Sequence, residues 1–441
     1  MNNHPKPKIT LIGAGSAVFS LLTFYDIVTA PELEGSSVTL MDINKDKLKF
    51  ARNVAEQLKN ESGAKIKIEA TLNRKEALEN ADFVIVAIEK DRMKTWKLDW
   101  EIPVKHGIKQ VIGECGGPGG LFHTFRVIPD ILEICRDMED LCPNAFLLNY
   151  TNPEGRVCLA VHRYSKIKVV GLCPGIYEQL ESIAKILGVE PEELDARAYG
   201  LNHFTWIKDL RFKEGRDAYP LLKEALKHNP DFQPLCRELF ERFGLYPSPS
   251  DNHVGEYISY GWDLCPEEVR GLNWINAHNE WCNKMISLAE QVVSRKISFE
   301  KLTQILREMK LNITRGRAID LIKAIVTNKP YLELAVNIPN KGNIINLPEN
   351  AIVEVPAIID GYGVHGLAMG ELPKPIAALC NIQVAIQELA IEAAVTGSHD
   401  IALQALLIDP VVHNAEAAKA AYKELMEVHT PYLPQFKKIV D

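Results

Sequence analysis

A cysteine and a histidine are the residues of this sequence best suited to bind a metal ion. Cys173 follows an apolar segment, and His203 lies thirty residues later, next to Asn202. A thiolate and an imidazole together suit a borderline divalent ion, and two protein ligands leave positions that substrate and water can fill. Two such residues can also be unrelated members of a core. The pair indicates a metal-dependent catalyst if the fold brings the side chains together.

Three further segments contain polar groups that could act on a substrate. Asn152 precedes Pro153 after an apolar segment, and its amide could hold a hydroxyl group. The glycine-rich run 116–120 offers backbone N–H groups at the start of a helix. Residues 250–257 contain six polar or ionisable side chains in eight, which suits a catalytic base or a substrate cage. The simpler alternatives are ordinary turns and a solvated loop.

A dinucleotide-binding turn is indicated near the N-terminus. The run GAGSAV lies where a predicted strand becomes a helix, and its glycines allow a tight turn and the close approach of a pyrophosphate. A valine replaces the third glycine of the usual pattern, so the run alone is a weak signal. A carboxylate at the end of the next strand strengthens it, because it accepts both ribose hydroxyls and repels a 2′-phosphate. We therefore predict an NAD site formed by Gly13, Gly15, Ser16, Ala17, Val18 and Asp42.

The predicted secondary structure explains how these residues could meet. Strand-like segments alternate with helix-length segments, which indicates a parallel, doubly wound sheet with right-handed crossovers. Ligands of such sheets bind outside the carboxyl ends of the strands. The polar segments 112–120, 149–154, 171–175 and 200–204 are placed at or near such ends. The predicted strands are 8–13, 37–41, 65–70, 83–88, 145–150 and 168–172.

The pattern changes after about residue 195. Residues 198–213 are predicted to form an antiparallel portion, and 266–294 and 374–408 are long amphipathic helical stretches. The strand at 351–359 contains Pro356, which places it at an edge or at the mouth of the site. We predict an α/β protein: an N-terminal Rossmann domain with a doubly wound parallel sheet at 1–195, and a C-terminal mixed α+β domain for substrate binding and oligomerisation at 196–441.

Composition excludes several functional classes. The 441 residues have a formal net charge of −8 and no Lys/Arg-rich run, so we expect no nucleic-acid partner. No run of about 18 apolar residues and no signal-peptide pattern are found, so we expect a cytoplasmic protein without a membrane partner. Nine cysteines without a CxxC pair fit reduced thiols in a reducing compartment.

Taken together, the motifs resemble those of glycoside hydrolase family 4, the NAD- and metal-dependent glycosidases. The resemblance spans nearly the whole chain and is closest to the α-glucosidase, α-galacturonidase and α-glucuronidase members. The long run at 336–342, VNIPNKG, is the most specific part. The other matching runs are LIGAGSAVF at 11–19, VTLMD at 38–42, YTNP at 150–153, GLC at 171–173, GLNH at 200–203 and VEVP at 353–356.

The resemblance implies a mechanism unlike hydrolysis by two carboxylates. NAD takes a hydride from carbon 3 of the sugar, a base removes the proton from carbon 2, and Mn²⁺ stabilises the resulting negative charge. The aglycone leaves by elimination, water adds, and the hydride returns, so NAD is not consumed. Family members usually assemble as homodimers or homotetramers.

The family's site residues can be carried over by position. Cys173 and His203 match its metal ligands, and Asn152 matches its substrate-holding asparagine. Asp251 lies in the loop that contains the candidate base, and Glu114 lies where an acidic residue is near the leaving group. Both are therefore expected to be catalytic.

One departure concerns the residue after the metal-binding cysteine. The family usually has histidine, aspartate or asparagine there, whereas this chain has Pro174. The absence of the aspartate and asparagine versions argues against 6-phosphorylated substrates. We expect an unphosphorylated α-glycoside or α-uronide, with His253 and Arg126 as candidate contacts for a uronate carboxylate.

Two alternatives remain open from the sequence. An NAD-dependent 2-hydroxy-acid dehydrogenase can also have Thr-Asn-Pro after a Rossmann strand and a later histidine, although such enzymes are shorter and need no thiolate. A catalytically silent NAD-sensing protein is the other alternative, and Pro174 lends it some weight.

Overall fold

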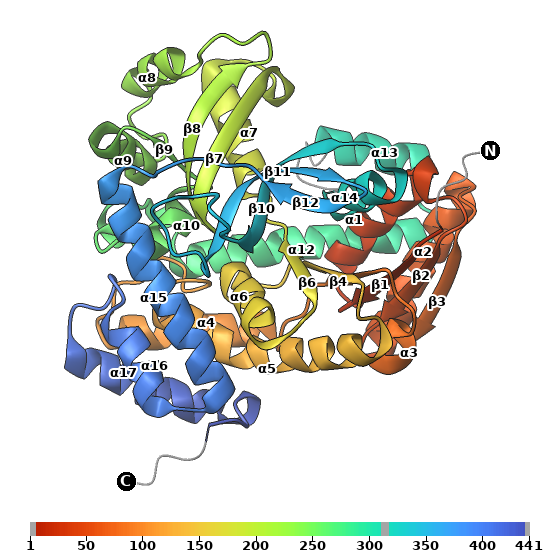
Figure 1. Cartoon of the computed structure of the whole chain (residues 1–441), viewed down its shortest axis with the longest axis horizontal. Coiled ribbons are helices and arrows are strands. Elements are labelled where there is room, and N and C mark those ends of the chain that lie inside the picture. Colours follow the sequence, from red (N-terminus) through yellow and green to blue (C-terminus); the bar gives the residue numbers. More distant parts are fainter. Residues whose placement is uncertain (1–5, 310–316, 437–441) are drawn as a thin grey trace.

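The computed structural model describes residues 6–309 and 317–436 and contains one twelve-stranded mixed sheet (Figure 1). Its first half is parallel with strand order β3-β2-β1-β4-β5-β6, the order of a doubly wound Rossmann sheet. The predicted parallel fold is therefore confirmed. The six strands are β1 (Lys8–Ile12), β2 (Ser37–Met41), β3 (Lys67–Thr71), β4 (Phe83–Val86), β5 (Phe146–Asn149) and β6 (Lys168–Gly171).

The second half of the sheet is antiparallel and continues directly from β6. One residue pair, Asn337 and Gly171, joins β10 to β6, and another, Glu354 and Gly200, joins β11 to β7. The predicted antiparallel portion is the β7–β8 pair. The predicted boundary at residue 195 falls within β7, so the domain division stays a prediction. The strands are β7 (Leu194–Leu201), β8 (Phe204–Phe212), β9 (Tyr246–Ser248), β10 (Tyr331–Pro339), β11 (Ile352–Asp360) and β12 (Gly363–Gly366).

Of the two places predicted for the strand containing Pro356, the edge of the sheet was wrong, and the mouth of the site stays a prediction. This strand, β11, is internal and pairs with β10, β7 and β12. Pro356 lies opposite a β-bulge, where the β10 register shifts between Glu333 and Val336, so its missing N–H interrupts no regular pair. Its carbonyl accepts a hydrogen bond of 2.8 Å from the Leu367 N–H.

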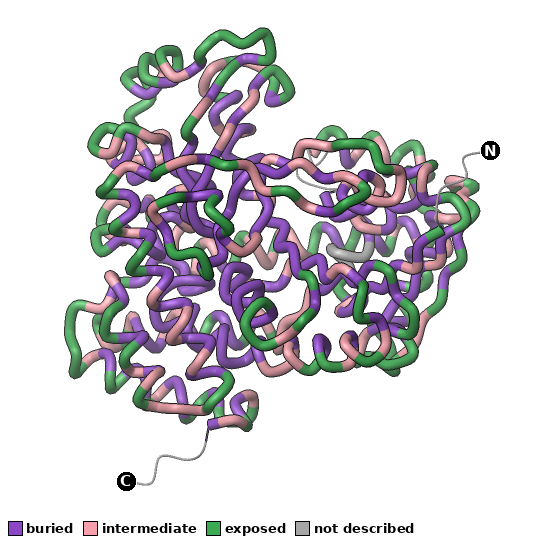
Figure 2. The backbone as a smooth tube through the Cα atoms, viewed as in Figure 1, coloured by how far each residue is buried: buried purple, intermediate pink, exposed green. Residues whose placement is uncertain are grey.

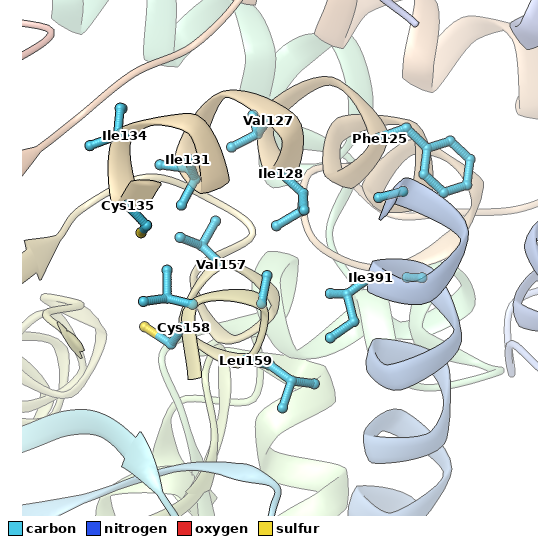
Figure 3. Packing of buried hydrophobic residues seen from close by; sticks show 14 of the residues in the cluster. Phe125, Val127, Ile128, Ile131, Ile134, Cys135, Val157, Cys158, Leu159 and Ile391 are labelled. Atoms are coloured by element: carbon cyan, nitrogen blue, oxygen red, sulfur yellow. The ribbon is translucent and has the colours of Figure 1, made fainter. Parts of the chain in front are cut away.

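Helices cover both faces of the parallel half. On one face, α1 (Ala17–Val28), α2 (Lys45–Ser62) and α12 (Gly271–Val293) enclose a core with Leu11 and Val38. On the other face, α5 (Gly117–Leu141), α6 (Glu154–Tyr164) and α15 (Lys374–Thr396) meet through residues such as Ile128, Val157 and Ile391 (Figure 3). Buried residues accordingly follow the sheet and the helix sides that face it (Figure 2).

The predicted helical stretch at 374–408 forms two helices. Gly397, with φ +69°, ends α15, and α16 (His399–Leu407) follows. Among the described residues, α15 alone has the length and apolar composition of a possible membrane span. It packs against α5, α6 and α16, and 56% of its most apolar window is buried.

Candidate active site

Glu114 lies at the centre of a polar cluster near the carboxyl ends of β4 and β5 and the turn between β7 and β8. Its Oε1 accepts a hydrogen bond of 3.1 Å from the Asn152 side-chain amide and is paired with the Arg92 guanidinium. Its Oε2 lies 4.0 Å from His253 Nδ1. Burial alone would raise the pKa of Glu114, but the charge of the Arg92 guanidinium holds it well below its usual range. Glu114 is therefore an anionic group in contact with an amide and an imidazole.

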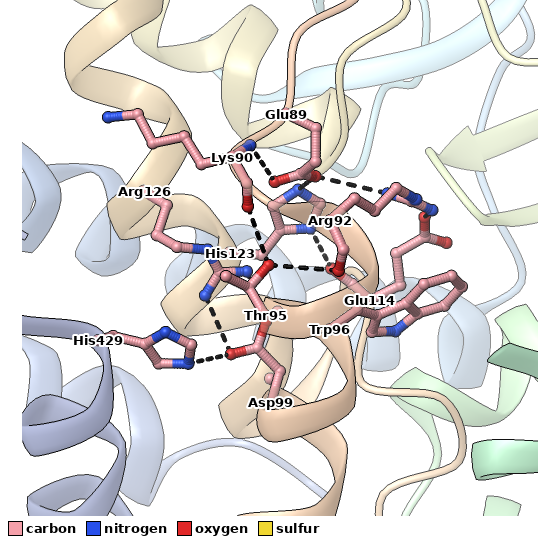
Figure 4. A network of polar contacts seen from close by, with 12 residues as sticks. Glu89, Lys90, Arg92, Thr95, Trp96, Asp99, Glu114, His123, Arg126 and His429 are labelled. Atoms are coloured by element: carbon pink, nitrogen blue, oxygen red, sulfur yellow. Dashed lines mark hydrogen bonds and ion pairs between the residues drawn. The ribbon is translucent and has the colours of Figure 1, made fainter. Parts of the chain in front are cut away.

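Arg92 links this cluster to the first helical turn after β4. It begins α4 (Arg92–Lys105), its Nη1 lies 3.4 Å from Glu89, and its guanidinium lies 4.4 Å from the Trp96 ring centroid (Figure 4). Glu89 in turn pairs with His123 on α5. Sequence reasoning did not identify Arg92, because no local pattern marks a residue whose partners lie in other segments.

Two histidines form the part of the cluster best suited to a metal ion. His203, in the β7–β8 turn with φ +60°, has its ring centroid 4.5 Å from that of His253. Burial lowers the pKa of both, that of His253 to about 3 with help from His203, so both are neutral near pH 7. The Nδ1 atoms of both are buried and have no hydrogen-bond partner within the described part of the chain. Neutral imidazoles with unpartnered nitrogens can act as metal ligands.

The donor atoms near His203 form two groups of three. One group contains His203, Glu114 and Cys115, and the other contains His203, His253 and Glu256, with the donor atoms of each group within 4.8 Å of one another. Such sets of nitrogen, sulfur and oxygen donors suit Zn²⁺ or Mn²⁺.

Cys173 follows β6 and is buried, with its Sγ accepting a hydrogen bond of 3.4 Å from the Gly175 N–H. Burial raises the pKa of its thiol. Neither group of three donor atoms includes Cys173. The pairing of Cys173 with His203 on one metal ion therefore stays a prediction.

A buried network next to Cys173 and His203 joins segments that are far apart in sequence. The Asn337 amide donates hydrogen bonds to Glu154 at 2.7 Å and to Glu354 at 2.8 Å, and Asn202 donates to the same oxygen of Glu354 at 2.8 Å. Sequence reasoning assigned no role to these residues. Their signal was present in the sequence, since a glutamate and an asparagine interrupt otherwise apolar strands, and Asn202 precedes the predicted ligand His203.

The glycine-rich run is held by internal carboxylates. Glu256 accepts hydrogen bonds from the N–H groups of Glu114, Cys115 and Gly116 at 2.6 to 3.3 Å. The Gly117 N–H donates to Asp409 at 3.2 Å. A Cβ atom on Gly116 would lie 2.5 Å from the Glu256 carbonyl oxygen. Residues 114–116 thus form a buried, internally bonded segment that places Glu114 just before α5, which begins at Gly117.

Two predicted site residues have other partners. The Asp251 carboxylate accepts hydrogen bonds from the Leu235 and Cys236 N–H groups, at 3.2 and 2.8 Å, at the start of α9 (Pro234–Phe243). Arg126 is 1% exposed and binds Asp99 through two hydrogen bonds of 3.0 and 2.5 Å (Figure 4). The roles of Asp251 as a base and of Arg126 as a uronate contact stay predictions.

The dinucleotide turn has the geometry expected of its glycines. Gly13 has φ +85°, and a Cβ atom there would overlap the Ala87 carbonyl. The Gly15 N–H donates a hydrogen bond of 2.7 Å to Asp42, and a Cβ atom on Gly15 would lie 2.6 Å from that carboxylate oxygen. The turn leads into α1, which begins at Ala17, so Ala17 and Val18 lie in its first turn. Ser16 is exposed at this turn.

Comparisons with known proteins cover nearly the whole chain. Residues 8–189 match the model of "Family 4 glycosyl hydrolase", and 198–412 match that of its C-terminal domain. The chain is 35% identical to an α-glucosidase of Erwinia rhapontici, over 98% of this chain and 99% of that protein. It is 33% identical to an α-galactosidase of Bacillus subtilis (strain 168), over 98% of this chain and 100% of that protein.

One solved structure with the same fold is a 6-phospho-α-glucosidase from gut microorganisms in complex with NAD and Mn²⁺. Its TM-score is 0.82 at 21% sequence identity, covering 98% of this chain and 100% of that one.

Proposed function

Because this chain belongs to family 4 of the glycosyl hydrolases, we propose that it cleaves an unphosphorylated α-glycoside with the help of NAD and a divalent metal ion, Mn²⁺. One observation carries the proposal: the buried His203, whose Nδ1 has no hydrogen-bond partner in the described structure, lies within 4.8 Å of other donor atoms around Glu114. The 2-hydroxy-acid dehydrogenase alternative is not favoured, since the models of this glycosidase family match both halves of the chain.

The nucleotide turn fits NAD. Gly13 and Gly15 leave no room for a side chain, and the helix that follows directs its first N–H groups toward the turn. Asp42 is only partly buried at the end of β2, and in our proposal its carboxylate, which accepts the Gly15 and Asn44 N–H groups, also accepts ribose hydroxyls. The negative charge of Asp42 disfavours a 2′-phosphate, which supports NAD over NADP.

The residues around His203 fit a divalent ion. In our proposal His203 and Cys173 hold it, as the family resemblance implies, and the carboxylate of Glu114 provides a further donor close to His203. When bound, NAD would accept a hydride from the sugar, and the metal ion would stabilise negative charge on the sugar oxygens. Asn152, held by Glu114, would position a sugar hydroxyl.

The proton on the neighbouring carbon needs a base. Asp251 is the candidate by family position, and burial raises its pKa, which suits a group that takes up a proton. Its carboxylate accepts hydrogen bonds from two backbone N–H groups. His253, beside Glu114 and His203, is not a better candidate, because a pKa of about 3 makes its imidazole a weak base.

The names of the two relatives, an α-glucosidase and an α-galactosidase, support a neutral α-hexoside as the substrate. A uronide is less well supported, because the guanidinium of Arg126 is already bound by Asp99. The residue after Cys173 is Pro174, which supplies no side-chain donor for a phosphate.

We also propose that the enzyme is cytoplasmic and forms a homodimer or homotetramer.

The test is a panel of aryl α-glucosides, α-galactosides and α-uronides incubated with NAD, MnCl₂ and a thiol reductant. We expect cleavage of an α-hexoside that stops with a chelator, returns with Mn²⁺ and leaves no net NADH. Cleavage that is indifferent to both NAD and metal would refute the proposal. Net NADH formation with malate or lactate would instead favour a dehydrogenase.

A further inference from the structure

Helix α12 presents three aromatic side chains on one side. Trp274, His278 and Trp281 are spaced by four and three residues, so they share one face of the helix. All three are only partly buried, whereas Ile275, which lies about 100° around the helix axis from Trp274, is buried, as is Met285 further along the same face. The face therefore keeps aromatic surface that the protein interior does not cover.

This aromatic face is continuous with the candidate active site. The Trp274 ring lies edge-on to His253, with centroids 5.9 Å apart and planes at 86°. The His278 ring lies 5.6 Å from that of Trp96, at 74°. Trp96 is the residue on which the guanidinium of Arg92 rests, and Arg92 is bound to Glu114.

The order of contacts shows which part of a substrate this face would meet. Asn152, the proposed holder of the reacting sugar, binds one oxygen of Glu114, and His253 lies beside the other. Trp274 in turn contacts His253, so the contacts run from Asn152 through Glu114 and His253 to Trp274. A group next to Trp274 is therefore separated from Asn152 by Glu114 and His253, which is the position expected of the part of the glycoside that leaves.

We propose that Trp274 and His278 form the binding subsite for the leaving group, and that they accept a flat ring: the C–H face of a pyranose or an aryl aglycone. This inference rests on the proposed glycosidase function. Partly exposed aromatic rings beside polar groups suit such a ligand, because a ring covers a large apolar area at little cost in conformational entropy.

The state of His278 is consistent with stacking. Burial, and then the charge of Arg92, lower the pKa of His278 to about 4, so the ring is neutral near pH 7. Its Nε2 lies 3.5 Å from the Sγ atom of Cys282, one turn further along the same helix, and this contact holds the imidazole ring in place. A neutral, fixed ring presents a face that a planar ligand can cover.

The experiment compares leaving groups on one sugar that the wild-type enzyme cleaves. Methyl, phenyl and disaccharide α-glycosides are assayed with the wild type, Trp274→Ala, Trp274→Phe and Trp262→Ala. Trp262 is a matched control, since its ring stacks on Trp100, carries the guanidinium of Arg270 and does not belong to the proposed subsite. We expect Trp274→Ala to lower kcat/KM for the phenyl and disaccharide substrates about tenfold, and for the methyl glycoside less than twofold.

Trp274→Phe should retain most of the preference for ring-shaped leaving groups, and Trp262→Ala all of it. An equal loss for all three substrates in Trp274→Ala would overturn the proposal. If the wild type cleaves no glycoside, the proposed function fails, and calorimetric titration with the phenyl glycoside in the absence of NAD then tests the subsite alone. In that titration, equal affinity of Trp274→Ala and wild type would overturn it.

Discussion

The side-chain amide of Asn202 donates a hydrogen bond of 2.8 Å to the carboxylate of Glu354, which ties the residue before His203 to the internal strand β11. Glu354 also accepts a hydrogen bond from the side-chain amide of Asn337, which donates a second one to Glu154. Burial raises the pKa of both carboxyl groups, which favours their protonated forms. The position of the His203 turn therefore depends on a buried network behind it.

Substitution of Glu354 tests this dependence. Glu354→Leu leaves the amides of Asn202 and Asn337 with fewer acceptors in the interior, so we expect a loss of about 1–3 kcal/mol in the free energy of unfolding. We also expect kcat to fall at least tenfold and the Mn²⁺ concentration needed for half-maximal activity to rise. Glu354→Gln retains a hydrogen-bond acceptor, so it should recover most of the stability and most of the activity. Denaturant unfolding and Mn²⁺ titrations provide the measurements, and unchanged Mn²⁺ affinity in Glu354→Leu would argue against a positioning role.

The two cysteines near the site can be distinguished by matched serine variants. We expect Cys173→Ser to abolish turnover and weaken Mn²⁺ binding at least tenfold, because a neutral hydroxyl is a poor replacement for a thiolate ligand. Cys115→Ser is the control and should retain metal binding. Activity assays and Mn²⁺ binding followed by electron paramagnetic resonance provide the readouts. The reverse order of effects would assign the metal to the group of His203, Glu114 and Cys115.

Asp42 is predicted to set the choice of nucleotide. Asp42→Ala removes the acceptor of the Gly15 N–H and the negative charge that we propose faces the ribose of bound NAD. We expect the Kd for NAD to increase about tenfold, and the preference for NAD over NADP to shrink, since a 2′-phosphate is no longer repelled. Fluorescence titrations with both nucleotides measure these changes. An unaltered ratio of the two Kd values would contradict the assignment.

Arg126 is expected to act on stability rather than on substrate choice. Arg126→Gln leaves Asp99 buried without its main counter-charge, although His429 Nε2 still lies 2.8 Å from it. We expect a loss of about 3–5 kcal/mol in the free energy of unfolding. The ratio of activity on α-uronides to that on α-hexosides should not change. A selective loss of uronide cleavage in a stable variant would restore Arg126 as a carboxylate contact.

Asp409 is predicted to make stability depend on pH. Burial raises its pKa from 3.8 to about 6 in the folded protein. The folded state therefore binds this proton more tightly than the unfolded state, so its contribution is fully present below about pH 4 and is lost as the pH rises through about 6. Asp409→Asn should flatten the decline in unfolding free energy across this window. An identical slope for variant and wild type, in denaturant titrations from pH 4 to 7, would contradict this assignment.

The parallel half of the fold was predictable because its signal is local. Its strands, apart from the more polar β3, are short apolar segments that are each followed by a helix, and Ser37–Met41 was predicted with the observed bounds. The place of β10 between β6 and β11 was not predictable, since it depends on pairing across more than 150 residues. Pro356 misled the prediction for β11 because the bulge opposite it is a property of the other strand.

The site was predictable to a similar extent. Glu114, Asn152, His203 and His253 were predicted as site residues from motifs and family resemblance, and the structure brings them together. Arg92, Glu256 and Glu354 went unrecognised because each is defined by its contacts with a distant segment. Asp251 stands within a polar motif, but its carboxylate caps a helix.

The pairing of β10 with β6 has a consequence for biosynthesis. While the ribosome is still translating the segments before residue 331, the outer side of β6 has no neighbouring strand, although the rest of the nucleotide-binding half is already complete. An open sheet edge of this kind recruits other chains. We therefore expect nascent or prematurely terminated chains to rely on chaperones, and gene fragments that stop before β10 to accumulate in inclusion bodies.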